Sequence, residues 1–426
     1  MRKDIHQMIF RYCCLGIAFM LPVWGKLVPS IIALLILNWL VSGVYLKTIP
    51  VLFIDKNRRN TLIFAGLYIL YIIGLLYTSD FAYAWFDLEV KLSLLIFPLV
   101  FATADIGFLN SKYLSLLMKV YVAGCVIGSL LLTGHAFALW REGVAGAFYY
   151  MKLSWYFHSA YFSMYLNFAI VFIVLELLGK FRSLPVYAKA LYTLLLCWFF
   201  VFIFLLSSKM GLICIVLIAG LTSAELIFRQ KRTFFGLGVI ILFLMLVRAG
   251  LHVFSGTSDR VEQSTETLSG KAAPETSKST NDRIAIWKIS LEIIKSNPLT
   301  GVGTGDVKDV LVAKYRENNI GEALELKLNA HNQYLQTFMT LGLPGIIMLL
   351  LMLILPMTAA FRSRDFLYFV FLLLFSLNIL VESMFETQAG VVWYAFFNIV
   401  LFTRMRDAGC EMRDEGCEMR DAGCEM

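Results

Sequence analysis

Long apolar stretches recur along the whole chain and constrain its fold more than any other feature of the sequence. Each stretch is about as long as a helix must be to cross the hydrocarbon core of a bilayer. We predict about twelve such spans, at residues 7–23, 27–46, 60–77, 89–103, 113–133, 158–178, 187–206, 209–228, 233–251, 332–357, 364–381 and 388–403. With 59% hydrophobic and 16% charged residues, a soluble domain of 426 residues could not cover this much apolar surface. The expected fold is therefore an all-α polytopic integral membrane protein with about 12 transmembrane helices. The first span has no small-residue cleavage pattern behind it, so we expect it to stay in the protein as a helix rather than act as a cleaved signal.

Lysine and arginine are distributed unevenly among the connections between these spans. With the N-terminus placed in the cytoplasm, the inner connections hold Arg2, Lys3, Arg11, Lys47, Lys56, Arg58, Arg59, Lys112, Lys180, Arg182, Lys189, Arg229, Lys231, Arg232, Arg362 and Arg364. The short outer connections hold few basic residues, namely Lys26, Arg141, Lys152 and Lys209, together with Asp80, Asp87, Glu382 and Glu386. Cytoplasmic connections of membrane proteins are enriched in Lys and Arg. We therefore expect both termini to be cytoplasmic and segment 252–331 to be extracytoplasmic.

The predicted spans divide the chain into four parts. Residues 1–251 hold transmembrane helices 1 to 9, residues 252–331 form a large extracytoplasmic loop, and residues 332–403 hold helices 10 to 12. The last part, 404–426, contains three near copies of a seven-residue unit, but each copy has a glycine and too few apolar residues for a coiled-coil seam. We expect a disordered cytoplasmic tail with no evident function.

Charge and cysteine usage exclude several partners. The net charge of +7 is spread between the spans rather than clustered on one face, so no nucleic-acid binding is expected. None of the eight cysteines lies in the longest polar loop and no CxxC pair occurs, which excludes a disulfide framework and a cysteine-based metal site. The outer segments contain no Asp-x-Asp pair. We therefore expect neither a metal nor a cofactor.

The large polar loop changes character along its length. Its first part, Ser255 to Thr280, has too few apolar residues to bury a core, so we expect it to be mobile. Residues 281–294 then repeat apolar side chains at helical spacing, with Asn281 or Asp282 as a natural cap. We predict an amphipathic helix that lies against the membrane face and ends at Asn297-Pro298.

A glycine-rich turn follows this helix. Gly301, Gly303 and Gly305 can adopt positive φ and expose backbone N–H groups to an anion, which makes them candidate substrate-binding residues. The turn lacks the Gly-Lys-Ser/Thr ending of a P-loop, so ATP binding is not expected. A simple turn without a ligand is the alternative interpretation.

His331 and Asn332 close the polar loop just before an apolar span that contains Gly342 and Gly345. The sequence thus places a protonatable group where water meets the bilayer, on a helix whose small residues allow another backbone to approach closely. The alternative is a polar helix start that contains a histidine without a chemical role.

Several other residues of the predicted outer face are candidates for the same site. Lys209 lies in a very short turn and breaks the positive-inside pattern, so a bound anion is favoured over a snorkelling lysine. Arg283 lies near a helix N-terminus, where the dipole disfavours a cation, and this also suggests an anionic partner. Three further candidates for substrate binding are Arg316, Glu382 and His158, although Glu382 and His158 could equally be a solvated cap and an interfacial residue.

These residues together resemble a known family. The chain resembles the O-antigen ligase and polymerase family of bacterial envelope glycosyltransferases over roughly residues 195–350. The pattern from His331-Asn332 to Gly342-x-x-Gly345 is similar to the ligase motif, and Asn297-Pro298 through Gly305 resembles the family's Pro–Gly-rich loop. Where family members commonly carry a Ser-Arg-Gly-like element, this chain has Ser208-Lys209-Met210-Gly211, which keeps the charge but loses the bidentate fork of arginine.

The resemblance implies a metal-independent glycosyltransferase of the bacterial inner membrane whose active site faces the periplasm. The donor would be a glycan on undecaprenyl diphosphate and the acceptor a sugar hydroxyl of lipid A core, with membrane lipid around both. Such a reaction needs cations on the departing diphosphate and a base near the attacking hydroxyl. We assign Lys209 and Arg283 to the diphosphate and His331 to the acceptor, with Asn332 beside it.

Three other functions remain possible at this stage. A polymerase of surface polysaccharide, or a protein O-oligosaccharyltransferase, would share the fold and the donor, and no sequence feature identifies the acceptor. A transporter of lipid-linked glycans belongs to another class, but it should carry charged residues deep within its spans. Here the spans are nearly free of charge, which favours an enzyme acting at the membrane surface.

Overall fold

The computed structural model describes residues 2–52, 56–253 and 278–422, and every regular element in these ranges is a helix. In chain order the elements are α1 (Arg2–Val23), η1 (Gly25–Leu27), α2 (Val28–Ser42), α3 (Val44–Leu52), α4 (Lys56–Thr61), η2 (Leu62–Ala65), α5 (Gly66–Ile73), η3 (Gly74–Tyr77), α6 (Phe81–Lys91), α7 (Ser93–Thr103), α8 (Ser111–Arg141), α9 (Tyr150–Leu153), α10 (Ser159–Lys180), α11 (Val186–Leu206), α12 (Lys209–Ala224), η4 (Glu225–Arg229), α13 (Thr233–Val253), α15 (Lys278–Ser296), α16 (Val307–Glu317), α17 (Gly321–Glu325), α18 (Gln333–Arg362), α19 (Phe366–Asn378), η5 (Met384–Glu386) and α20 (Gln388–Ala422). The predicted all-α class is confirmed.

The apolar helices coincide with the predicted spans. Among the described residues, nine helical segments are long and apolar enough to cross a membrane, and α7 and α19 are shorter apolar helices. The predicted span 388–403 forms the first part of α20. The protein is thus a polytopic membrane protein, whereas the count of twelve stays a prediction. Two expected spans are short because α7 begins only at Ser93 and α19 ends at Asn378.

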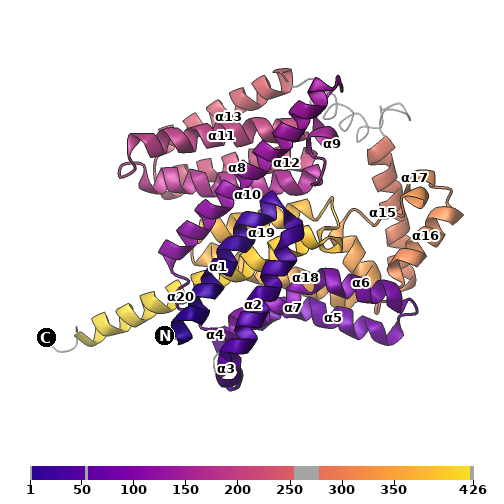
Figure 1. The fold of residues 1–426 in the computed structure, drawn as a ribbon, viewed down its shortest axis with the longest axis horizontal. Coiled ribbons are helices and arrows are strands. Elements are labelled where there is room, and N and C mark those ends of the chain that lie inside the picture. Colours follow the sequence, from indigo (N-terminus) through magenta and orange to yellow (C-terminus); the bar gives the residue numbers. More distant parts are fainter. Residues whose placement is uncertain (1, 53–55, 254–277, 423–426) are drawn as a thin grey trace.

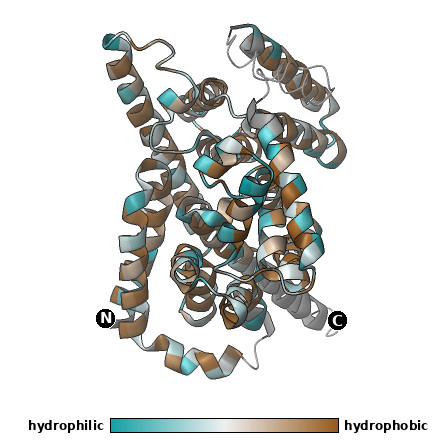
Figure 2. Cartoon of the chain, turned by 90° about the vertical axis from the view of Figure 1, so that its right-hand side faces the viewer, coloured by the Kyte–Doolittle hydropathy of each residue, from teal (hydrophilic) through white to brown (hydrophobic). Residues whose placement is uncertain are grey.

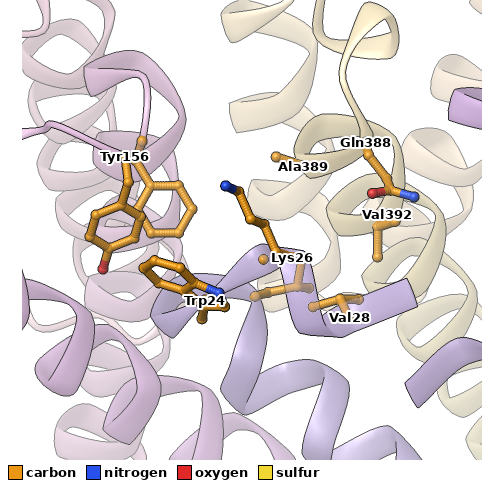
Figure 3. A pocket seen from close by; sticks show the side chains of 10 residues that line it. Trp24, Lys26, Val28, Tyr156, Gln388, Ala389 and Val392 are labelled. Atoms are coloured by element: carbon orange, nitrogen blue, oxygen red, sulfur yellow. The ribbon is translucent and has the colours of Figure 1, made fainter. Parts of the chain in front are cut away.

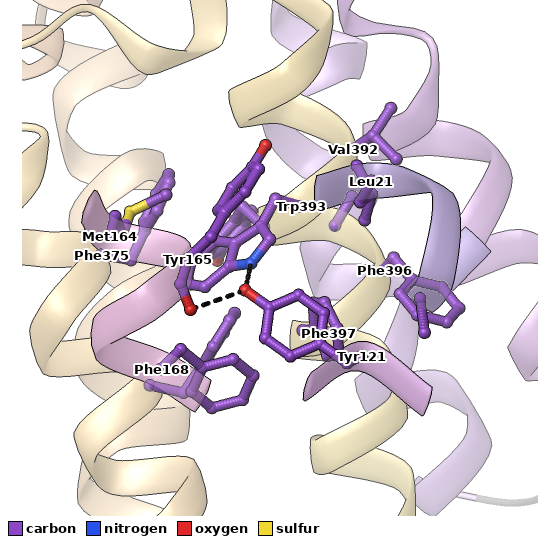
Figure 4. Packing of buried hydrophobic residues seen from close by; sticks show 14 of the residues in the cluster. Leu21, Tyr121, Met164, Tyr165, Phe168, Phe375, Val392, Trp393, Phe396 and Phe397 are labelled. Carbon is purple, nitrogen blue, oxygen red and sulfur yellow. Dashed lines mark hydrogen bonds between the residues drawn. The ribbon is translucent and has the colours of Figure 1, made fainter. Parts of the chain in front are cut away.

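Aromatic side chains fill the centre of the bundle, where α8, α10, α19 and α20 meet (Figure 4). The indole Nε1 of Trp393 donates a hydrogen bond of 3.1 Å to the hydroxyl of Tyr121, which donates in turn to the carbonyl of Tyr165 at 3.0 Å. The ring of Phe371 lies 4.7 Å from that of Trp393. The indole of Trp393 and the hydroxyl of Tyr121 thereby each have a hydrogen-bond partner, so these two rings can pack in the core without an unsatisfied polar atom.

The outer helices expose apolar side chains along their length. On α2 these include Leu34, Leu37 and Leu40, and on α13 they include Phe234 and Phe235. Apolar surface this extensive would be unfavourable in water but suits contact with lipid chains.

Helices α15, α16 and α17 form a small unit beside the bundle, and Figure 2 shows hydrophilic and hydrophobic residues mixed on this side of the molecule. Its core contains Ile286, Ile289 and Ile293 from α15 and Leu311 and Tyr315 from α16. The predicted amphipathic helix therefore exists, but its apolar face packs against α16 and α18 rather than against a membrane face. It also begins at Lys278, so Asn281 and Asp282 lie inside the helix and do not cap it. The expected mobile stretch 255–280 falls mostly outside the described residues.

The two chain ends lie away from this unit. In Figure 1 the start of α1 and the far part of α20 lie left of centre, whereas α15, α16 and α17 are at the right. The extracytoplasmic position of segment 252–331 stays a prediction. Helix α20 continues to Ala422, although the sequence predicts a disordered tail from residue 404. Arg, Glu, Met and Ala are good helix formers, and they extend a helix whose apolar first part is already packed.

Candidate functional site

A break in α18 positions the start of this helix. Gly342 has φ +63° and ψ −154°, so the segment before it points in a different direction from the long segment after it. A Cβ at Gly342 would lie 2.3 Å from the carbonyl oxygen of Leu299, and one at Gly301 would lie 2.5 Å from the backbone of Thr340. Glycine is therefore required at both positions, where the glycine-rich turn crosses α18 in direct backbone contact.

The amide groups of the glycine-rich turn are used within the protein. Gly301 donates to the carbonyl of Asn297, Gly303 to that of Thr340 at 3.0 Å, and Gly305 to the hydroxyl of Thr78 at 2.7 Å. The following Asp306 accepts hydrogen bonds from the amides of Ser79 and Asp80. The turn thus fastens α15 and α16 to α18 and to the connection before α6. Its amides are not available to a phosphate, so its predicted role in substrate binding gains no support from this geometry.

The start of α18 is fixed against the segment between α19 and α20. The side chain of Asn332 caps α18 by accepting from the amide of Leu335, and the amide of Asn332 donates to the hydroxyl of Ser383. The side chain of Gln333 accepts from the amide of Phe385 at 2.7 Å. Two consecutive residues, the cap of α18 and its first residue, therefore hold the segment that carries Glu382.

This anchoring brings His331 to Glu382. His331 has φ +44°, an uncommon conformation for a residue with a Cβ, and its amide donates to the side chain of Asn329. Its ring Nδ1 lies 3.3 Å from Oε2 of Glu382. The other carboxylate oxygen, Oε1, accepts from Nη2 of Arg283 on α15 at 2.8 Å. One carboxylate is thus shared by an imidazole and a guanidinium from two distant parts of the chain.

The surroundings keep Glu382 ionised. Its side chain is only 7% exposed, and burial by itself would raise its pKa. The hydrogen bond with His331 and the charges of Arg283 and His158 outweigh burial and hold the pKa of Glu382 below its usual range. Arg283 and His331 are 31% and 23% exposed, so a ligand can still reach both of them.

His158 and Lys209 lie at the starts of two neighbouring helices. His158 is the residue before α10 and is close enough to Glu382 to act on its pKa. Lys209 is the first residue of α12, directly after Ser208, whose hydroxyl caps that helix. Helices α10 and α12 touch near these starts, because a Cβ at Gly211 would lie 2.7 Å from the side chain of Ser163. His158 and Lys209 are therefore at the same end of the bundle.

Residues 192–350 match the family model described as O-antigen ligase. The chain carries an O-antigen ligase domain. No curated protein matches the chain significantly. The ligase domain contains Lys209, Arg283 and His331, whereas Glu382 and His158 come from outside the matched residues. Arg283, His331, Glu382 and His158 are here called the charged cluster. The cluster is thus assembled from the ligase domain and from segments on both sides of it.

One predicted residue of the ligase domain lies apart from this cluster. Arg316 is exposed on α16, next to Tyr315, whose side chain is buried in the core of the α15–α17 unit. None of its described contacts joins Arg316 to Glu382, so this geometry does not support a shared role.

The structure adds a buried ionic group that sequence reasoning missed. The ammonium of Lys91, which is fully buried, contacts Asp87 one turn earlier on α6 and lies 3.1 Å from Glu386. It also lies 4.7 Å from the ring centre of Tyr71. The i, i+4 spacing of Asp87 and Lys91 is visible in the sequence, but the third partner is not. Glu386 lies four residues after Glu382. The ionic contacts of Lys91 therefore hold the C-terminal end of the segment that carries the shared carboxylate.

Among the described residues, no three His, Cys, Asp or Glu side chains gather in an arrangement that could hold a metal ion.

Proposed function

We propose that this protein transfers a glycan from undecaprenyl diphosphate to a hydroxyl of a lipid A core sugar on the periplasmic face of the bacterial inner membrane. The ligase domain implies a glycan transferase with lipid-linked substrates. The observation that carries the proposal is the carboxylate of Glu382, shared between Arg283 and His331.

His331 is the group that accepts the proton of the attacking hydroxyl. A carboxylate accepts hydrogen bonds only, so the contact with Glu382 favours a proton on Nδ1 and leaves Nε2 as a lone-pair acceptor. This is the arrangement of a general base whose orientation and tautomer are set by a third group. As the hydroxyl oxygen bonds to the anomeric carbon, its proton passes to Nε2, and the ionised Glu382 stabilises the resulting imidazolium.

Arg283 and Lys209 stabilise the leaving group. The bond between the anomeric carbon and the diphosphate oxygen breaks as the new glycosidic bond forms, and the carrier leaves as an anion. Arg283 uses one terminal nitrogen on Glu382, so its other N–H groups can donate to the diphosphate. Lys209 adds a point charge from the start of α12. Since these cations supply the positive charge, we expect turnover to be insensitive to a chelator.

The placement of the charged groups favours an enzyme over a transporter. His331 lies two residues before α18 begins, and Glu382 lies four residues after α19 ends. The charges therefore belong to helix ends and connections rather than to the middle of apolar spans, where a transported charged substrate would need them.

Glycolipid analysis of a deletion strain tests the acceptor. Loss of the ligase leaves free lipid A core together with carrier-linked polymer. Core that bears a single repeat unit would instead indicate a polymerase. Intact lipopolysaccharide with unglycosylated protein would indicate a protein O-oligosaccharyltransferase.

A further inference from the structure

A cavity of about 210 Å³ lies beside the charged cluster, between the first two helices and the start of α20. Trp24 and Tyr156 form one side of it, and Gln388, Ala389 and Val392 form the other. Figure 3 shows the side chain of Lys26 rising between these two sides with its ammonium group toward the open space. Small-molecule sites typically measure roughly 300–1,000 Å³, so this cavity suits one sugar unit rather than a whole glycan.

Each side of the cavity is held in place by a hydrogen bond to the surrounding structure. The hydroxyl of Tyr156 donates to the carbonyl of Val23 at 3.1 Å, and its ring lies 5.2 Å from that of Trp24. On the opposite side, the hydroxyl of Tyr165 donates to the carbonyl of Ala389 at 2.9 Å. Both sides are thus preorganised, which lowers the cost of ordering them around a ligand.

Of the described residues that line this cavity, Lys26 is the only charged one. Among the residues that the structure describes, it has no carboxylate partner, and its ammonium contacts the ring of Trp24 at 5.9 Å. An interfacial anchor of the bilayer would account for a tryptophan, a tyrosine and a lysine at a helix end. It would not account for a cavity that also has the side-chain amide of Gln388 on the side opposite Trp24 and Tyr156.

The cavity and the charged cluster share two segments of chain. Tyr156 and Phe157 line the cavity, and His158 follows them at the cluster. Gln388 and Ala389 line the cavity, and Glu382 precedes them in the same connection. The hydroxyls of Thr387 and Tyr161 join the two segments at 3.0 Å. The cavity lining is therefore close in sequence to both His158 and Glu382.

We propose that this cavity binds an anionic sugar of the acceptor glycolipid, an inference that rests on the proposed function. Lys26 would pair with a phosphate or carboxylate on the sugar, Gln388 would bond a hydroxyl, and the rings of Trp24 and Tyr156 would cover the apolar face of the sugar. The exposed apolar side chains of α2 lead away from the cavity, so a lipid-anchored acceptor can enter from the bilayer. The donor diphosphate is then left to Arg283 and Lys209.

The test compares Lys26→Met with Lys152→Met in the full-length protein in nanodiscs. Lys152 is a matched control because it is an exposed lysine whose ammonium donates to the carbonyl of Ala145, outside the cavity. The probe is lipid A core, with its phosphates intact or removed by phosphatase. At saturating donor, Lys26→Met should raise the KM for the phosphorylated probe about tenfold, the loss expected for one charge-assisted contact, and leave kcat within about twofold. Lys152→Met should leave both unchanged.

Four results would overturn the proposal. The first is an unchanged acceptor KM in Lys26→Met, and the second is a rise in the donor KM instead. The third is an effect of Lys26→Met that is equally large for the dephosphorylated probe. The fourth is an effect that follows the anionic phospholipid content of the nanodisc, as expected if Lys26 binds a phospholipid headgroup. Binding of the same probe to the His331→Ala protein gives a readout without turnover. If His331→Ala binds the phosphorylated probe more tightly than the dephosphorylated one, and Lys26→Met abolishes this difference, the cavity site is supported even if no transfer product forms. Failure of the proposed function can thus be distinguished from failure of the cavity site.

Discussion

Glu382 accepts a hydrogen bond of 2.8 Å from Arg283, a residue 99 positions earlier in the chain. The same carboxylate contacts His331 through its second oxygen. These contacts join α15, which carries Arg283, to the connection that carries Glu382. They do so at the point where α18 begins. Removing the carboxylate should disturb both partners at once.

The shared carboxylate should make folding stability depend on pH. The folded-state pKa of Glu382 lies below its unfolded value of about 4.3. A group of this kind adds stability that is fully present above the unfolded pKa and is lost as pH falls through the folded pKa. The Tm of the wild type in detergent should therefore exceed that of Glu382→Gln by a constant margin above about pH 5, and the margin should shrink at lower pH. A margin that does not vary with pH would contradict the assignment.

The buried group around Lys91 should matter for stability and not for chemistry. Lys91→Met leaves Asp87 and Glu386 facing each other without a cation, which typically costs about 3–5 kcal/mol. Adding Asp87→Asn and Glu386→Gln removes the unpaired charges and should restore much of the lost stability. The measurement is the unfolding midpoint in detergent. A triple variant no more stable than Lys91→Met would show that charge pairing is not what Lys91 contributes.

Which features of the site could be predicted depends on how far apart in the sequence the interacting residues lie. Apolar spans are local patterns, so the helices and the class could be predicted. Arg283, Lys209 and His331 were candidates because of their immediate neighbours and because of the resemblance to a family. The pairing of Arg283 with Glu382, and of Lys91 with Glu386, depends on how distant helices pack, and no local pattern encodes it. The glycine-rich turn illustrates the reverse case. Gly301 and Gly303 have the positive φ angles that their sequence allows and Gly305 does not, whereas the use of the turn's amides within the protein could not be predicted.

The contact between the glycine-rich turn and α18 should tolerate no side chain. Gly342→Ala places a Cβ against the carbonyl of Leu299 in a backbone conformation that alanine rarely adopts, and it should lower the amount of folded protein in the membrane. Gly134→Ala is the control, since a Cβ there meets nothing within 4 Å. Immunoblots of membrane fractions measure both. Equal abundance of the two variants would mean that the turn can move away from α18.

The topology can be tested with introduced cysteines after the native ones are replaced. Asn319 and Ser363 are both exposed, the first in the α15–α17 unit and the second after α18. An impermeant thiol reagent added to intact spheroplasts should label Asn319→Cys and not Ser363→Cys, because lysine and arginine concentrate in the connections on the side of Ser363. The opposite labelling would reverse the orientation and remove the site from the periplasm.

The most direct test of the catalytic assignment is turnover by purified protein with carrier-linked glycan and an acceptor. His331→Ala and Arg283→Ala should each reduce kcat by about 10²–10⁴-fold, because each removes a positioned group that acts in the transition state, while membrane abundance stays near wild type. His6→Ala is the matched control, since its ring contacts Asn38 within the α1–α2 pair and touches no part of the cluster. The account predicts normal turnover by His6→Ala and almost none by His331→Ala. Near-normal turnover by His331→Ala would contradict it.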